Sequence, residues 1–216
     1  MPRVQPDEVP GTGARHDRIP AHGKDALRAR IIAARRALTP VARAEAAESL
    51  RGHVLELAAD LEDGPVCAYL PIGTEPGSVE LLDSLRATGR SVLLPVVPAR
   101  PGPLDWAPYL GAGAVGPGPH RLLEPTTARL GPAALRTAVL VLVPALAVDR
   151  RGNRLGRGAG YYDRTLGAAT RGTLLAALLH DGELLDDLPA DPHDRPVAAV
   201  VQPSSGTLAL GNNSRP

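Results

Sequence analysis

The chain has 216 residues, of which 44% are hydrophobic, so it is long enough to bury a core without disulfide or metal staples. A net charge of +1 and a single cysteine, Cys67, exclude a strongly basic nucleic-acid surface, an internal disulfide and a cysteine-based zinc cluster. No apolar run is long enough to span a bilayer, and residues 1–22 lack the apolar core of a secretory signal. We therefore expect a cytoplasmic protein with no nucleic-acid or membrane partner.

Both ends of the chain are rich in residues that break regular structure. Four prolines lie within residues 1–22, and residues 204–216 read SSGTLALGNNSRP. These segments are therefore predicted to be a flexible leader and a flexible tail. A single folded domain is predicted over residues 23–203.

The first predicted helix, Lys24–Leu38, carries two different stripes at helical spacing. One stripe is apolar, and the other is basic and contains Lys24, Arg28 and Arg35. Lys24 is the only lysine among the 24 basic residues of the chain. It is therefore either an accident of composition or a group that the protein needs as a lysine.

Helices and strands are predicted to alternate along the rest of the domain. A second helix is expected over residues 41–60, and a third over 78–87 with Ser78 as its N-cap. Continuous apolar runs predict buried strands at Val66–Leu70, Ser91–Val97, Ala138–Val143, Thr173–Leu179 and Val197–Val201. The run at 138–143 is the most apolar and is expected to be central, and the run at 197–201 is expected to be the last strand. The pattern predicts an α/β fold, a mostly parallel sheet with helices on both faces.

A glycine-rich segment, residues 152–160, follows the predicted central strand. Open α/β folds bind ligands at the carboxyl ends of their strands, which is where this segment lies. Alternating glycines let the backbone approach a phosphate closely, and Arg154 and Arg157 add guanidinium groups that suit phosphate oxygens. The spacing is neither that of the Walker A motif nor that of the dinucleotide fingerprint, so a plain turn with two solvated arginines is the alternative.

A helix is expected to begin near Tyr161, directly after the glycine-rich segment. Its positive end would point at the same phosphate. Asp163 follows at once, and a carboxylate beside phosphates is a natural ligand for Mg²⁺. The alternative is that Asp163 only stabilises the start of this helix.

The string NRLGRGAGYYD, residues 153–163, resembles the signature of the 5-formyltetrahydrofolate cyclo-ligase family, the 5,10-methenyltetrahydrofolate synthetases. The usual form of that signature ends close to G-x-R-L-G-x-G-x-G-Y-Y-D. The resemblance extends from Lys24 to about Val201. It implies an ATP- and Mg²⁺-dependent enzyme that closes 5-formyltetrahydrofolate to 5,10-methenyltetrahydrofolate and releases ADP and phosphate.

The resemblance also implies which residues bind the nucleotide. The segment KDALR, residues 24–28, is similar to the family's K-x-x-L-R, whose lysine and arginine contact ATP phosphates. Lys24 and Arg157 would be catalytic, because they would neutralise the charge on the phosphoryl group as it moves. The implied ATP-binding residues are Lys24, Arg28, Arg154, Leu155, Gly156, Arg157, Gly158, Ala159, Gly160, Tyr161 and Tyr162.

Four residues are implied to bind the folate: Leu70, Glu75, Trp106 and Tyr161. The carboxylate of Glu75 would accept paired hydrogen bonds from the amino-pyrimidine edge of the pterin, and the alternative is an ordinary surface glutamate in a turn. Trp106, the only tryptophan, would either stack on the pterin or cap the core.

The implied metal ligands are Asp163 and Asp194. The chain departs from the usual family pattern shortly after Asp194, where it carries Ala198 and Gln202. The expected partners are therefore a reduced folate and ATP, and the chain is expected to be a monomer or a weak homo-oligomer. A non-catalytic nucleotide-binding paralogue is the alternative function. The full set of charged residues favours the enzyme, because a paralogue released from catalysis would lose such residues first.

Overall fold

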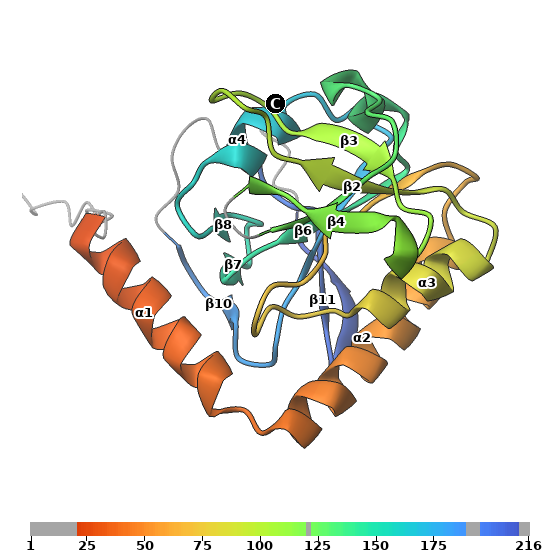
Figure 1. Cartoon of the computed structure of the whole chain (residues 1–216). Helices are drawn as coiled ribbons and strands as arrows, with labels where there is room; N and C mark the ends of the chain where they lie inside the picture. The colour runs from red at the N-terminus through yellow and green to blue at the C-terminus, as the bar shows by residue number, and fades with distance from the viewer. Residues whose placement is uncertain (1–20, 120–121, 189–194, 212–216) are drawn as a thin grey trace, which may run out of the picture.

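The computed structural model describes residues 21–119, 122–188 and 195–211 (Figure 1). Its helices are α1 (Ala21–Ala37), α2 (Pro40–Ala59), α3 (Val79–Ala87) and α4 (Tyr161–Leu166), with two short 3₁₀ helices, η1 (Ala112–Ala114) and η3 (Pro132–Thr137). Its strands are β1 (Val66–Cys67), β2 (Val92–Val96), β3 (Asp105–Pro108), β4 (Val115–Pro117), β5 (Leu123–Pro125), β6 (Leu140–Pro144), β7 (Ala147–Asp149), β8 (Arg154–Leu155), β9 (Leu174–Leu178), β10 (Leu184–Leu185), β11 (Ala199–Gln202) and β12 (Gly206–Ala209). None of the helices in these ranges has the length and hydropathy needed to cross a bilayer.

A seven-stranded sheet in the order β12-β11-β9-β6-β1-β2-β3 forms the centre of the molecule. The five inner strands pair in parallel, while the edge strands β3 and β12 run antiparallel to their neighbours. Strand β6 lies in the middle of the sheet, as its uninterrupted apolar sequence predicted. The fold is therefore the predicted α/β type, with a mixed sheet whose parallel strands all end at the same edge.

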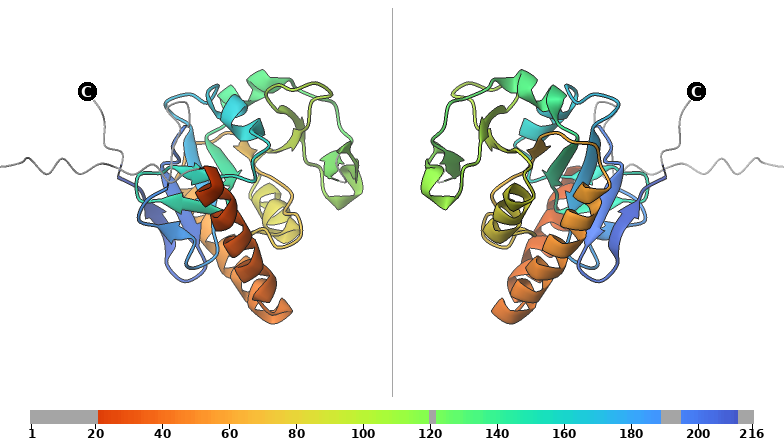
Figure 2. Two further views of the ribbon diagram at one scale, coloured as in Figure 1. Left: turned by 90° about the vertical axis from the view of Figure 1, so that its left-hand side faces the viewer. Right: turned by 90° about the vertical axis from the view of Figure 1, so that its right-hand side faces the viewer.

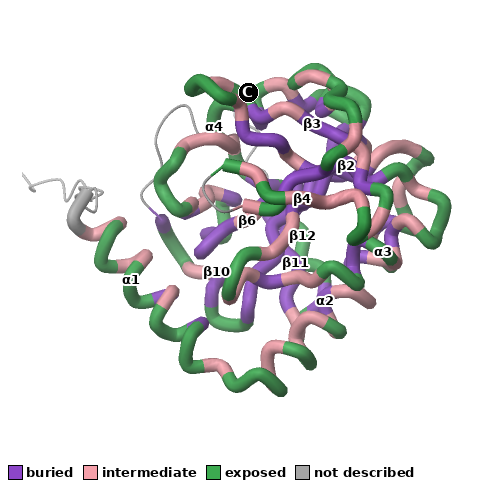
Figure 3. Tube along the Cα trace, viewed as in Figure 1, coloured by how far each residue is buried: buried purple, intermediate pink, exposed green. Residues whose placement is uncertain are grey.

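Helices cover both faces of this sheet. Helices α2 and α3 pack Leu50 and Leu85 on one face, and η3 and α4 pack Leu135 and Leu166 on the other. In Figure 3 the buried positions are concentrated in the strands, as expected for parallel strands that are covered on both sides. The predicted N-cap of α3 is confirmed, because the Ser78 hydroxyl accepts a hydrogen bond from the Leu81 amide at 3.2 Å.

Helix α1 packs apart from the main sheet, at the outside of the molecule (Figures 1 and 2). Its apolar stripe contacts a smaller sheet, β10-β7-β8, where Ile31 joins Leu146, Leu155 and Leu188 in a separate cluster. A third sheet, the hairpin β4–β5, projects from the side of the molecule opposite to strands β11 and β12 (Figure 2). Helix α1 therefore packs against β7 and β8, the two strands that flank the start of the glycine-rich segment.

Three sequence predictions need correction. Part of the supposed flexible tail, Gly206–Ala209, is strand β12, so the strand at 197–201 is not the last one. Pairing with the edge of β11 gives this weakly apolar segment its strand structure, which no local pattern shows. Helix α1 begins at Ala21, ahead of Lys24, and the rest of the predicted leader lies outside the described residues. The predicted strand 66–70 is regular only over Val66–Cys67.

Candidate active site

A cavity of about 630 Å³ lies where β1, β2 and β6 end at the carboxyl edge of the sheet. Its apolar wall contains Leu70, Ile72, Leu94, Val97, Leu104 and Leu146, among others. Its polar, glycine-rich wall contains Arg154, Asp163 and the loop 156–160, and Glu75 faces it from the segment that follows β1. Apolar walls with a few converging charged groups are typical of a small-molecule site.

The hairpin β7–β8 brings the glycine-rich segment back to the end of β6. Asp149 is fully buried at its turn and accepts hydrogen bonds from the amides of Arg151, Asn153 and Leu188, each at 2.9–3.0 Å. Arg154 then donates from Nη1 to the Pro144 carbonyl at 3.3 Å. Asp149 therefore shapes the hairpin, and Arg154 ties it to the central strand.

Two positions of the loop require glycine. Gly158 and Gly160 have φ angles of 102° and 69°, in the left-handed region that side chains disfavour. Gly160 precedes α4, which has only six residues, so few peptide dipoles align there. The helix end that we expected to attract a phosphate is therefore short, and the positive charge at this wall comes from side chains.

Helix α1 contacts the same loop through its basic stripe. The Nε of Arg28 donates to the Gly156 carbonyl at 3.0 Å, and Lys24 lies half-buried one turn earlier on the helix. Neither side chain borders the cavity itself, and Leu155 is buried beneath α1. The other predicted nucleotide-binding residues, Arg154 and Gly156 to Tyr162, all border it.

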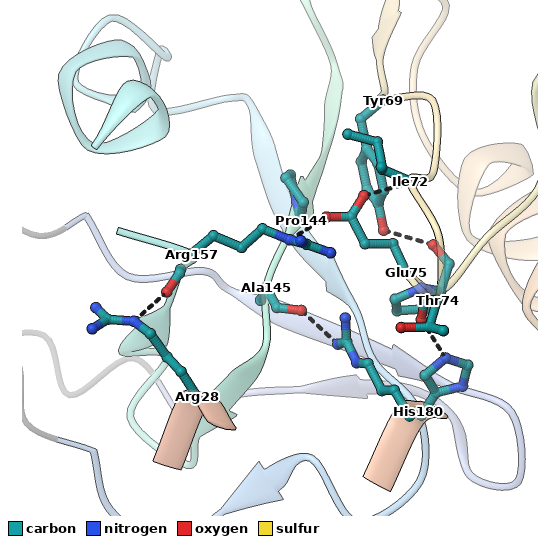
Figure 4. A network of polar contacts seen from close by, with 12 residues as sticks. Arg28, Tyr69, Ile72, Thr74, Glu75, Pro144, Ala145, Arg157 and His180 are labelled. Carbon is teal, nitrogen blue, oxygen red and sulfur yellow. Dashed lines mark hydrogen bonds and ion pairs between the residues drawn. The ribbon is translucent and has the colours of Figure 1, made fainter. Parts of the chain in front are cut away.

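Glu75 and Arg157 meet across the cavity (Figure 4). The Nε of Arg157 lies 2.8 Å from Oε1 of Glu75, and the Ile72 amide donates to the other carboxylate oxygen at 2.9 Å. The Glu75 side chain is only 9% exposed, whereas that of Arg157 is 50% exposed. The segments that we assigned to folate and to ATP are therefore joined directly by one ion pair.

Two tyrosine hydroxyls lie beside this ion pair. Tyr69 donates to the Pro76 carbonyl at 2.8 Å, and Tyr162 has a buried hydroxyl without a hydrogen-bond partner in the described structure. Burial raises the pKa of both phenols, and the negative charge of Glu75 raises it further. Both hydroxyls therefore keep their protons at neutral pH, and the Tyr69 hydroxyl acts as a neutral donor.

The cavity also includes a residue that the sequence reasoning did not assign, Arg35. It is 2% exposed and forms a bidentate ion pair with Glu183, with Nε–Oε1 and Nη2–Oε2 distances of 2.6 and 2.8 Å. Nη2 also donates to the Ala145 carbonyl at 2.7 Å. The basic stripe of α1 was the one sequence signal for Arg35. Its partner Glu183 lies 148 residues away in the sequence, so no local pattern could indicate the pair.

The remaining predicted residues have different positions. Trp106 is completely buried in the core and does not border the cavity, so the structure gives it the second of its two expected roles. Asp163 borders the cavity and pairs with Nη2 of Arg154. Asp194 lies outside the described residues. Within the described ranges, no three Asp, Glu, His or Cys side chains are grouped to hold a metal ion.

Comparison with known proteins identifies the family. The family model of 5-formyltetrahydrofolate cyclo-ligases matches residues 20–203. The chain belongs to this family. The cyclo-ligase fold and the ligase class of enzyme, both implied by the glycine-rich signature, are thereby confirmed.

Individual cyclo-ligases resemble the chain over most of its length. The 5-formyltetrahydrofolate cyclo-ligase of Mycolicibacterium smegmatis is 43% identical over 191 residues, which cover 87% of this chain and 97% of that protein. The Escherichia coli K12 enzyme is 30% identical and covers 79% of this chain and 94% of its own length. The solved structure of the Aquifex aeolicus 5,10-methenyltetrahydrofolate synthetase shares the fold, with a TM-score of 0.73 at 24% identity over 89% and 95% of the two chains.

Proposed function

We propose that this cyclo-ligase converts 5-formyltetrahydrofolate and ATP to 5,10-methenyltetrahydrofolate, ADP and phosphate, with Mg²⁺ bound beside the phosphates. One observation carries the proposal beyond family membership. Glu75, which suits a pterin edge, and the arginine- and glycine-rich wall, which suits phosphates, face each other across a single cavity. The two substrates would therefore lie side by side.

The folate half of the cavity is built by the segments after β1 and β2. Leu70, Leu94 and Val97 offer an apolar surface for the pterin ring. Glu75 is fixed at the rim by the Ile72 amide, so its carboxylate is held ready for the amino-pyrimidine edge. This pterin would take the place of Arg157 on Glu75.

The nucleotide half is built by the glycine-rich segment and α1. Arg157 is half exposed and would turn from Glu75 to the phosphates, while Arg154 is held in the wall by its bond to Pro144. The hydrogen bond from Arg28 to Gly156 brings the start of α1 to the loop, where Lys24 would reach the terminal phosphate. A cluster of fixed positive charge stabilises a phosphoryl group that is being transferred.

The reaction needs positioning more than a side-chain nucleophile. The formyl oxygen attacks the γ-phosphorus and the bond from that phosphorus to the β-bridging oxygen breaks, which releases ADP. N10 of the folate then attacks the activated carbon, the carbon–oxygen bond breaks, and phosphate leaves with the N10 proton as the ring closes. Arg157 and Lys24 would balance the charge that develops on the phosphoryl oxygens, and the apolar walls would exclude water.

Asp163 is the described residue that fits a magnesium ion. Its carboxylate is 47% exposed at the cavity, and Mg²⁺ commonly takes one or two protein carboxylates and completes its shell with phosphate and water. When bound, the ion would supply further neutralisation of the phosphate oxygens. Arg154 would keep Asp163 oriented through their ion pair.

A spectrophotometric assay tests the proposal. Purified protein, 5-formyltetrahydrofolate, ATP and Mg²⁺ are mixed, and the near-ultraviolet absorbance of the methenyl product is followed. The absorbance is expected to rise only in the complete mixture, and not when ATP is omitted or when the metal is chelated. Folded protein that binds ATP but forms no methenyl product would instead support the non-catalytic paralogue.

A further inference from the structure

The Arg35 guanidinium is a buried group with one nitrogen unused. Nε and Nη2 donate to Glu183 and Ala145, but Nη1 is buried without a partner in the described part of the chain. Folded proteins rarely leave a buried donor unsatisfied, because water has been removed from it without replacement. Arg35 also borders the cavity, so a bound molecule is a candidate acceptor.

The charge of Arg35 is already balanced, which limits what this acceptor is. Both carboxylate oxygens of Glu183 lie within 2.8 Å of the guanidinium, and neither side chain exceeds 8% exposure. A phosphate would add an unbalanced negative charge next to Glu183. A neutral carbonyl oxygen accepts one hydrogen bond from Nη1 without that cost.

Arg35 also lies on the folate side of the cavity. Glu183, the partner of Arg35, also accepts a hydrogen bond from the His180 backbone amide at 2.8 Å, and the Nε2 atom of His180 lies 3.3 Å from the carbonyl oxygen of Thr74, the residue directly before Glu75. On the other side of Glu75, the Pro76 carbonyl accepts a hydrogen bond from the Tyr69 hydroxyl, and Tyr69 borders the cavity. The unused donor therefore lies near the carboxylate that suits the amino-pyrimidine edge.

We propose that Arg35 binds the folate by donating from Nη1 to a neutral carbonyl oxygen of that ligand. This inference rests on the proposed function, since it takes the occupant of the cavity to be a reduced folate. Two oxygens have the required chemistry: the ring carbonyl beside the amino-pyrimidine edge and the carbonyl of the formyl group.

The test compares folate binding by the wild type and by the variant Arg35→Lys without nucleotide, so that no turnover occurs. A lysine keeps the charge opposite Glu183 but has no second nitrogen to donate into the cavity. We expect the Kd for 5-formyltetrahydrofolate to rise about tenfold to hundredfold. The Kd for a non-hydrolysable ATP analogue is expected to stay within about twofold of the wild-type value, because Arg35 does not contact the nucleotide in this proposal.

A second folate distinguishes the two oxygens. Tetrahydrofolate has the ring carbonyl but no formyl group. If Arg35→Lys weakens binding of both folates, the acceptor is the ring carbonyl, and if it weakens only that of the formylated one, the acceptor is the formyl oxygen. Either result supports the proposal.

Arg90→Lys is the matched control. Arg90 donates to carbonyls at the end of α2, including those of Ala58 and Leu61 at 2.5 and 2.9 Å, and it does not border the cavity. This variant is expected to lower the melting temperature and leave folate affinity unchanged. Equal losses of folate affinity in both variants, or an unchanged affinity in Arg35→Lys, would show that Arg35 is only structural.

A structure of the wild-type protein with 5-formyltetrahydrofolate tests the contact even if Arg35→Lys does not fold. We expect Nη1 within about 3.2 Å of a ligand carbonyl oxygen. A water molecule on Nη1 in place of the ligand overturns the proposal. A wild type that binds no folate overturns the proposed function as well, whereas wild-type binding with no Arg35 contact overturns this inference alone.

Discussion

Two arginine–glutamate pairs lie at the same cavity, one with both side chains at its wall and the other through Arg35 alone, and their surroundings differ. Arg35 and Glu183 are 2% and 8% exposed and are joined by two hydrogen bonds, with a third from Arg35 to Ala145. Arg157 and Glu75 are 50% and 9% exposed, and the ion pair has a single close contact of 2.8 Å. The first, called the sealed pair below, is buried on both sides and connects α1 to the turn before β10. The second, the half-exposed pair, has one partner in solvent.

Burial determines what each pair does. Removing one partner of a buried pair leaves an uncompensated charge in the interior, whereas an exposed pair contributes little and exchanges readily. The sealed pair therefore holds the deep end of the cavity in shape. We propose that the half-exposed pair holds Glu75 and Arg157 in place until ligands replace each of them.

The largest expected effect is on stability. Glu183→Ala leaves Arg35 charged and buried, so we expect it to lower the free energy of unfolding by about 3–5 kcal/mol. Glu75→Ala is expected to cost no more than about 1 kcal/mol, because Arg157 then turns to water. Urea unfolding of both variants measures the difference, and equal losses would contradict the distinction between the pairs.

The half-exposed pair is expected to matter for turnover instead. Arg157→Ala should reduce kcat by roughly 30- to 1000-fold, equivalent to about 2–4 kcal/mol of transition-state stabilisation, while the protein stays folded. Arg150→Ala is the matched control, since Arg150 is exposed on the same hairpin and pairs with Asp186 away from the cavity. Steady-state kinetics of the two variants decide the matter, and equal activity would place Arg157 outside the reaction.

A substitution in a third pair, Arg154–Asp163, tests the proposed magnesium site. Asp163→Asn keeps the shape but removes the charge, so we expect activity to fall about tenfold or more and to recover partly at high Mg²⁺. Activity is measured over a magnesium titration. Normal activity with a lowered melting temperature would instead show that Asp163 serves only to position Arg154.

Glu75→Gln tests whether the shared pair couples the two halves. We expect the Kd for 5-formyltetrahydrofolate to rise about tenfold, because the charged acceptor is lost. The affinity for an ATP analogue is expected to rise by up to about fivefold, since Arg157 no longer has to leave Glu75. Calorimetry measures both, with Glu80→Gln on α3 as the exposed control. A large loss of nucleotide affinity would reverse the assignment of the two halves.

The smallest expected effect concerns pH and the surroundings of the sealed pair. Burial lowers the pKa of His180, which donates its backbone amide to Glu183, so the folded protein resists its protonation. The unfolded chain binds that proton more readily, so this contribution to stability is complete above pH 6.5 and falls as the pH drops below it. His180→Gln should therefore show a smaller drop in melting temperature between about pH 7 and pH 5. An unchanged drop would show that His180 does not titrate in this range.

Of the two regions, the one around Glu75 and Arg157 could largely be predicted from local patterns in the sequence. The apolar run of β6, the glycines at positive φ and the position of Glu75 after β1 depend on a few neighbouring residues. The two segments that resemble the family therefore indicated Glu75 and Arg157, and both residues border the cavity. It could not show that they contact each other, because side-chain pairing depends on the whole fold.

The region around Arg35 and Glu183 depends on contacts between segments that are far apart in the sequence. Arg35 meets Glu183 only because α1 packs on the small sheet, and nothing in either segment indicates the partner. Trp106 likewise joins the core through strand β3 at the sheet edge, which the proline-rich sequence around it does not predict. Strand β12 forms because β11 offers it an edge.

We propose that one cavity holds both substrates and couples phosphoryl transfer to ring closure. The most direct test measures phosphate release and methenyl formation together in the wild-type protein. We expect one phosphate to be released for each methenyl product, and no phosphate release when either 5-formyltetrahydrofolate or Mg²⁺ is absent. Steady ATP hydrolysis without folate, or phosphate release without ring closure, would contradict it.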